Sequence, residues 1–187
     1  MLKEKNKDQI FVFVDTEFSS FESMDLLSLG AVTLHDNNSF YEEVDYKLLI
    51  DDCSGFVLQH VMPLLDGPRK SLPSDQVWRR WQSWLTSLKS SESQEIVLIS
   101  DAPSYDGYCI RKWASNQKNH LDSDLYPRIV HLGTTEKVIL QCFEEVLGRY
   151  YREHHAMDDV LLNKYAYLNA GGYLSETLKV STQPGAE

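Results

Sequence analysis

The stretch IFVFVDTEF, residues 10–18, decides the fold of this chain. Residues 10–14 form an uninterrupted apolar run, which predicts a central β-strand covered on both faces. Asp15 and Glu17 then follow two positions apart. Because strand side chains alternate between faces, both carboxylates should leave the same face, with Cα atoms roughly 6 to 7 Å apart. This spacing lets the two side chains converge on one pair of metal ions.

The elements outside this strand predict one α/β domain. Residues 26–34 read as a second strand in which Gly30 permits close backbone approach. The polar residues 35–39 predict a hairpin turn into a strand over 40–50. Ser54 can cap a short helix through Leu65. The remaining predicted elements are a tryptophan-rich helix over 73–90 with its apolar face on the core, a strand over 95–100, a helix running to about Gln117, a strand over 128–132, a helix over 135–148 and a helix from about 155 to 170.

Length and composition limit the class of protein. With 187 residues, of which 42% are hydrophobic, the chain predicts a single domain over 1–187, with a core of about 10–170 and a frayed tail after about 175. Its apolar runs are far shorter than the roughly 20 residues of a membrane helix, and its first nine residues are polar. We therefore expect a soluble, cytoplasmic protein without membrane contact. Cys53, Cys109 and Cys142 are widely separated, which favours reduced core thiols.

The net charge is −10, from 18 Lys and Arg against 28 Asp and Glu. Proteins that bind long nucleic acid usually displace counterions with a basic surface, so this charge argues against tight, sequence-independent binding. Three interpretations stay open: a short substrate, a locally basic groove on an acidic body, or a substrate that is not a polymer.

Further acidic residues stand beside apolar segments. Asp106 falls in the first turn of a predicted helix, where the macrodipole favours a carboxylate, and this position alone suits a helix-terminal charge as well as a metal ligand. The sequence HHAMDD, residues 154–159, enters the last predicted helix. On a continuous helix His155 and Asp159 share a face, whereas His154 does not. Asp158 is expected to face solvent.

This ordered set resembles the DEDDh exonucleases of the ribonuclease H-like fold. The resemblance covers roughly residues 10–170, and the segments that carry it are FVDTEF (13–18), SLGAV (28–32), SYD (104–106) and HHAMDD (154–159). Any one of these motifs is weak, but their order is fairly specific. The fold that the resemblance implies is a mixed β-sheet flanked by α-helices.

The resemblance also implies a set of site residues and a cofactor. By analogy, Asp15, Glu17 and Asp159 bind a first Mg²⁺ or Mn²⁺ ion, and Asp15 and Asp106 bind a second. The family histidine lies five positions before the last aspartate, outside the helix, which selects His154 as the general base. An imidazole can accept a proton near pH 7. The expected substrate contacts are Thr16, Phe18 and Tyr105.

The expected activity is a metal-dependent 3′-5′ exonuclease that releases nucleoside 5′-monophosphates from the 3′ end of single-stranded RNA or DNA. The acidic surface favours RNA or short oligonucleotides. Two alternatives remain: a nucleic-acid-binding or assembly module without turnover, and a different two-metal phosphodiesterase or endonuclease on the same scaffold. A homodimer formed through the tryptophan-rich helix is also compatible with the sequence.

Overall fold

The computed structural model describes residues 9–47, 49–67, 69–117, 127–132 and 151–169. The predicted helix over 135–148, Cys142 and the predicted frayed tail lie outside these ranges. Within them, no helix is long and apolar enough to cross a membrane.

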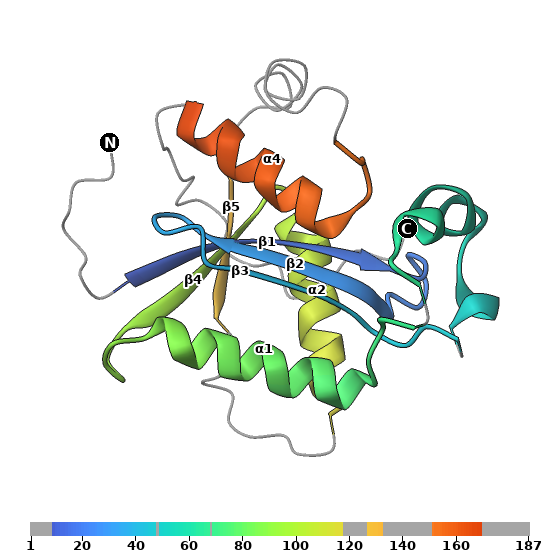
Figure 1. Cartoon of the computed structure of the whole chain (residues 1–187), viewed down its shortest axis with the longest axis horizontal. Helices are drawn as coiled ribbons and strands as arrows, with labels where there is room; N and C mark the ends of the chain where they lie inside the picture. Colours follow the sequence, from blue (N-terminus) through green and yellow to red (C-terminus); the bar gives the residue numbers. More distant parts are fainter. Residues whose placement is uncertain (1–8, 48, 68, 118–126, 133–150, 170–187) are drawn as a thin grey trace.

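The centre of the fold is a five-stranded mixed sheet (Figure 1). Its strands are β1 (Gln9–Phe18), β2 (Leu26–Thr33), β3 (Ser39–Glu43), β4 (Glu95–Ser100) and β5 (Arg128–His131). They are arranged in the order β3-β2-β1-β4-β5, so the apolar run of residues 10–14 does lie in the central strand. Strand β1 pairs antiparallel with β2 and parallel with β4. The predicted hairpin between the second and third strands is confirmed, because β2 and β3 pair antiparallel.

Helices cover both faces of the sheet (Figure 1). On one face, Val12 and Val14 of β1 belong to a core cluster with α1 (Ser74–Leu88) and α2 (Pro103–Ser115), in which Trp81 is fully buried. On the other face, Phe13 packs against Tyr167 of α4 (Ala156–Asn169). The continuous apolar run is therefore explained, since consecutive residues of β1 meet different helix layers.

The predicted strand over 40–50 is wrong in its length, because β3 ends at Glu43. Just beyond β3 the Val44 N–H still donates to the Leu27 carbonyl of β2 at 2.9 Å, and the chain also pairs with Leu72: the Leu72 N–H donates to the Glu43 carbonyl at 2.9 Å, and the Asp45 N–H donates to the Leu72 carbonyl at 2.7 Å. A 3₁₀ turn, η1 (Ile50–Asp52), follows. The hairpin signal in the sequence could not reveal this pairing with Leu72.

The predicted helix from Ser54 to Leu65 is present as irregular helical turns. It contains a π-helical segment, η2 (Val57–Val61), followed by a 3₁₀ turn, η3 (Met62–Leu64). The predicted cap is confirmed, since the Ser54 hydroxyl accepts the Val57 N–H at 3.2 Å. Pro63 has no N–H to continue an α-helical ladder, which favours the change in helix type.

Gly30 sets the distance between the sheet and α4. It pairs with Asp15 across β1 and β2, and a Cβ atom added to it would lie 2.4 Å from the Ala156 carbonyl oxygen. The close backbone approach predicted at Gly30 is therefore confirmed. As a result, the beginning of α4 lies against the sheet beside Asp15.

Candidate active site

A pocket of about 760 Å³ opens at the carboxyl ends of the parallel strands β1 and β4. Its floor is formed by the end of β1, and its walls by the beginnings of α2 and α4 and by η2 with the segment before it. All the predicted site residues line it: Asp15, Thr16, Glu17, Phe18, Tyr105, Asp106, His154 and Asp159. The packing thus brings together side chains that are more than 140 positions apart in the sequence.

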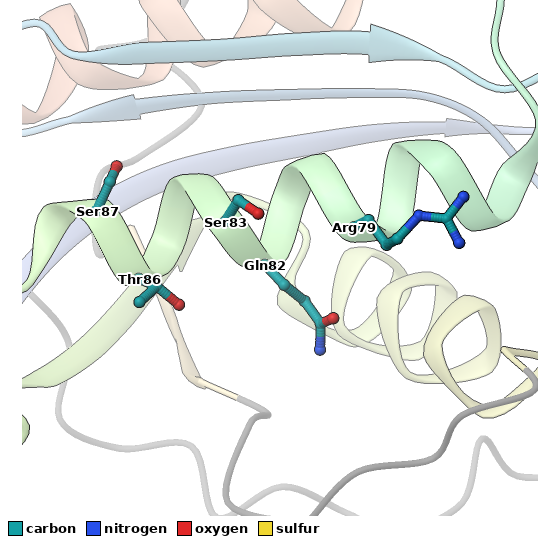
Figure 2. A pocket seen from close by; sticks show the side chains of 5 residues that line it. All are labelled: Arg79, Gln82, Ser83, Thr86 and Ser87. Atoms are coloured by element: carbon teal, nitrogen blue, oxygen red, sulfur yellow. The ribbon is translucent and has the colours of Figure 1, made fainter.

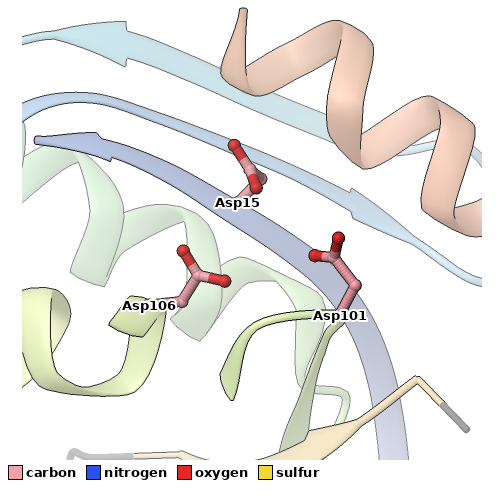
Figure 3. A group of neighbouring side chains, drawn as sticks. All are labelled: Asp15, Asp101 and Asp106. Atoms are coloured by element: carbon pink, nitrogen blue, oxygen red, sulfur yellow. The ribbon is translucent and has the colours of Figure 1, made fainter. Parts of the chain in front are cut away.

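Two groups of carboxylates meet in this pocket and share Asp15. One group contains Asp15, Glu17 and Asp159, and the other contains Asp15, Asp101 and Asp106; within each group the oxygen atoms that could bind a metal ion lie within 4.8 Å of one another. Figure 3 shows the side chains of the second group directed toward a common point from β1, from the end of β4 and from α2. Hard divalent cations prefer such oxygen ligands, so both groups fit a Mg²⁺ or Mn²⁺ ion.

Asp106 is held rigidly by its neighbours. One carboxylate oxygen, Oδ1, accepts the Thr16 N–H at 3.0 Å and the Thr16 hydroxyl at 2.6 Å, and Oδ2 accepts the Ser100 hydroxyl. These three bonds occupy three of about four lone-pair positions on the carboxylate, which leaves one for a cation. The main-chain donor of Thr16 is thus directed to Asp106, and a substrate contact by Thr16 stays a prediction.

The electrostatics of the cluster favour a positive ion. Burial, and then the charge of Asp159, raise the pKa of Glu17 to about 8. Burial raises the pKa of Asp159 and of Asp106 to about 7 each, although hydrogen bonds from Tyr151 and from Ser100 and Thr16 respectively act in the opposite direction. The pKa of Asp15 is raised well above its ordinary value by burial and by the neighbouring carboxylates. Deprotonated carboxylates in this pocket therefore repel one another, and a bound cation relieves that repulsion.

Asp101 is a member of the cluster that the sequence analysis missed. It directly follows β4, and its exposed carboxylate accepts a hydrogen bond of 2.9 Å from the Asn163 side-chain amide on α4. The available signal was its position, because a residue just after a buried parallel strand lies at the same sheet edge as Asp15.

The structure separates the two neighbouring histidines. His154 precedes α4, has a left-handed backbone (φ +67°) and lines the pocket, where its ring meets the edge of Phe56 at 4.9 Å between centroids. His155 is only 4% exposed and stacks on Tyr41 outside the pocket. Burial, followed by the Arg152 charge, lowers the pKa of His155. The helical geometry that favoured His155 does not apply, because α4 begins only at Ala156.

The expectation that Asp158 faces solvent is wrong. Its side chain is only 16% exposed and forms an ion pair with Arg152. This pairing uses the Arg152 guanidinium.

Aromatic rings line the pocket together with the carboxylates. Phe18, Phe21 and Tyr105 form a row with centroid distances of 5.5 and 5.4 Å, and Phe21 is 70% exposed. Phe56, also exposed, lines the pocket beside His154. Exposed ring faces of this kind can stack on unpaired bases. Within the described ranges, the residues that line the pocket include no lysine or arginine.

A second, shallow hollow lies over the outer face of α1 and is lined by Arg79, Gln82, Ser83, Thr86 and Ser87 (Figure 2). Arg79 is already paired with Asp75 at 2.8 Å. All five residues come from one helix, and they bring no acidic group together. We therefore take the carboxylate pocket as the candidate functional site.

The sheet order and the helices on both faces define a ribonuclease H-like fold, the fold of the DEDDh-type exonucleases. The RNase domain of the yeast Pop2 protein aligns with 86% of this chain over 76% of its own length, with a TM-score of 0.53 and 14% identity. The S. pombe Pop2p structure in its Mg²⁺- and Mn²⁺-bound form aligns with 85% of this chain over 81% of its own length, with a TM-score of 0.50 and 10% identity. At such low identity these similarities establish the fold. No protein-family model matches the chain, and no curated protein sequence matches it significantly.

Proposed function

We propose that this protein is a metal-dependent 3′-5′ exonuclease that removes nucleoside 5′-monophosphates from single-stranded nucleic acid. The observation that carries the proposal is the pocket in which two carboxylate groups share Asp15 and in which His154 also lies. The metal-bound form of a structural neighbour with the same fold supports the choice of Mg²⁺ or Mn²⁺.

Each carboxylate has a role in this proposal. Asp15, Glu17 and Asp159 would hold one cation, while Asp15 and Asp106, with Asp101 beside them, would hold the second. When bound, such cations would supply electrostatic stabilisation of the charge that develops during phosphodiester hydrolysis. The His154 imidazole accepts the proton of the attacking water, which is suitable chemistry near pH 7. Tyr151 donates its hydroxyl hydrogen to Asp159 and so orients that carboxylate.

The pocket walls favour a single strand over a duplex. Rings such as Phe21, Tyr105 and Phe56 can stack only on a base whose face is free. Because the described lining of the pocket contains no lysine or arginine, most of the attraction for phosphate would come from the bound cations. This favours RNA or short oligonucleotides that are held near their 3′ end, in agreement with the net charge of −10.

Product analysis tests the proposal. A 5′-labelled single-stranded oligonucleotide, as RNA and as DNA, is incubated with the protein in Mn²⁺ or in EDTA. We expect stepwise shortening from the 3′ end with Mn²⁺ only, loss of cleavage in Asp15→Asn, and no loss in the matched surface variant Asp75→Asn. Internal cuts would support an endonuclease instead, and binding without any metal-dependent cleavage would support a non-catalytic module.

A further inference from the structure

The backbone of His154 is held in a costly conformation. Its φ of +67° lies in the left-handed region. For a residue with a Cβ atom this conformation is unfavourable, and it persists only where the surrounding structure imposes it. His154 is the residue that projects into the pocket, so the contacts that impose this turn also set where its imidazole lies.

An ion pair joins Arg152, which precedes His154, to Asp158, which follows it. The Arg152 side chain donates to the Asp158 carboxylate through Nε at 2.9 Å and through Nη2 at 3.1 Å. The Arg152 main-chain N–H donates to the same carboxylate at 3.0 Å. Asp158 lies in the first turn of α4, and the His155 N–H donates back to the Arg152 carbonyl at 3.1 Å. A side chain and a main-chain group thus tie the entering segment to the helix, with a bidentate geometry that only arginine provides.

A stacked ring pair fixes the same turn to the sheet. The buried His155 ring lies on Tyr41 of β3, with 4.8 Å between centroids and 22° between planes. The Tyr41 hydroxyl donates to the Glu43 carboxylate at 2.8 Å, and the same Glu43 oxygen accepts the Asp66 N–H at 2.6 Å. His155 is therefore anchored to β3, while the ion pair holds Arg152 and Asp158 together. His154 has little freedom to leave the pocket.

We propose that the Arg152–Asp158 ion pair and the His155–Tyr41 stack form a positioning device for His154. Neither pair lines the pocket, so they act on the reaction only by holding the left-handed turn that directs the imidazole toward the carboxylates. This inference rests on the proposed function, because it gives His154 the role of general base. If the ion pair served stability alone, its loss would change kcat by the same factor with and without the His154 side chain.

A double-mutant cycle tests the proposal on the full chain, with kcat, KM and Mn²⁺ affinity measured on a short single-stranded oligonucleotide. Asp158→Asn is expected to lower kcat by about 10- to 100-fold, since small misplacements of a catalytic group have effects of this size. KM and Mn²⁺ affinity should stay unchanged. In a His154→Ala background the same substitution should cause no further loss of kcat, because the effects of substitutions at coupled residues do not add. Equal losses in both backgrounds, or no loss in the single variant, would overturn the proposal.

Two further variants and a second readout complete the test. Arg152→Lys keeps the charge but not the bidentate fork, so it should lower kcat in the same direction even if Asp158→Asn folds poorly. Asp75→Asn, which breaks an exposed ion pair on α1, should leave kcat, KM and Mn²⁺ affinity unchanged. Hydrogen exchange at the His155 amide should accelerate at least about tenfold in Asp158→Asn as the turn opens. This measurement needs no activity: unchanged exchange refutes the positioning device, whereas a wild-type protein that never cleaves refutes the proposed function.

Discussion

Gly30→Ala is the most direct test of how the fold assembles the site. The added Cβ would lie 2.4 Å from the Ala156 oxygen, 2.5 Å from the Ala156 carbonyl carbon and 2.8 Å from the Met157 nitrogen. Ordinary contact begins at 3.4 Å, so relief requires a shift of 3.4 − 2.4 = 1.0 Å. The obstructing atoms are backbone at the beginning of α4, and no side-chain rotation can clear them. The helix must therefore move away from β2.

Such a shift should affect stability and the site together. Overpacking of this kind costs about 1–3 kcal/mol. For a protein of this size, 1 kcal/mol corresponds to about 2–4 °C in melting temperature, which gives a fall of about 2–12 °C. Asp159 and His154 are attached to the displaced end of α4, and a misplacement of 1 Å can cost about 100-fold in rate.

Calorimetry with and without Mn²⁺, combined with the cleavage assay, measures both effects. The melting temperature should fall in EDTA, and the further rise that Mn²⁺ gives should shrink, because Asp159 moves away from Asp15 and Glu17. Gly55→Ala is the matched control, since a Cβ at Gly55 meets nothing within 4 Å. If Gly30→Ala melts at the wild-type temperature and keeps the full response to Mn²⁺, the close approach of α4 does not position the site.

Three other outcomes follow from the same structure. In EDTA, the melting temperature should fall as the pH rises from about 4.5 to 8, because the folded state holds protons on Glu17, Asp106 and Asp159 that the unfolded chain has already released. Saturating Mn²⁺ should flatten this decline. A melting temperature in EDTA that does not change with pH would contradict this expectation. Asp101→Asn should weaken Mn²⁺ binding in calorimetric titrations by about 10- to 100-fold, whereas equal affinity would remove Asp101 from the cation site. Trp81→Ala should lower the free energy of unfolding by about 3–5 kcal/mol in denaturant titrations, and a loss below 1 kcal/mol would show that Trp81 is not packed in the core as described.

Several features could be predicted from the sequence because they are encoded locally. The apolar run before Asp15 specified a central strand, since only a strand covered on both faces tolerates consecutive apolar residues. The spacing of Asp15 and Glu17, the cap at Ser54 and the first-turn position of Asp106 follow from backbone geometry over a few residues. The close approach at Gly30 was readable from the residue type alone.

Other features depend on contacts between distant segments. The pairing with Leu72 beyond the end of β3 joins distant segments, and the position of His154 rather than His155 in the pocket results from where α4 begins and from the stack on Tyr41. Asp101 joins the cluster only because β1 and β4 are parallel neighbours that end at one sheet edge. The sequence by itself determined which chemical groups this protein carries and the strand on which two of them lie. Only the tertiary structure decided which groups converge, because convergence depends on packing distances of a few ångströms between segments that no local pattern relates.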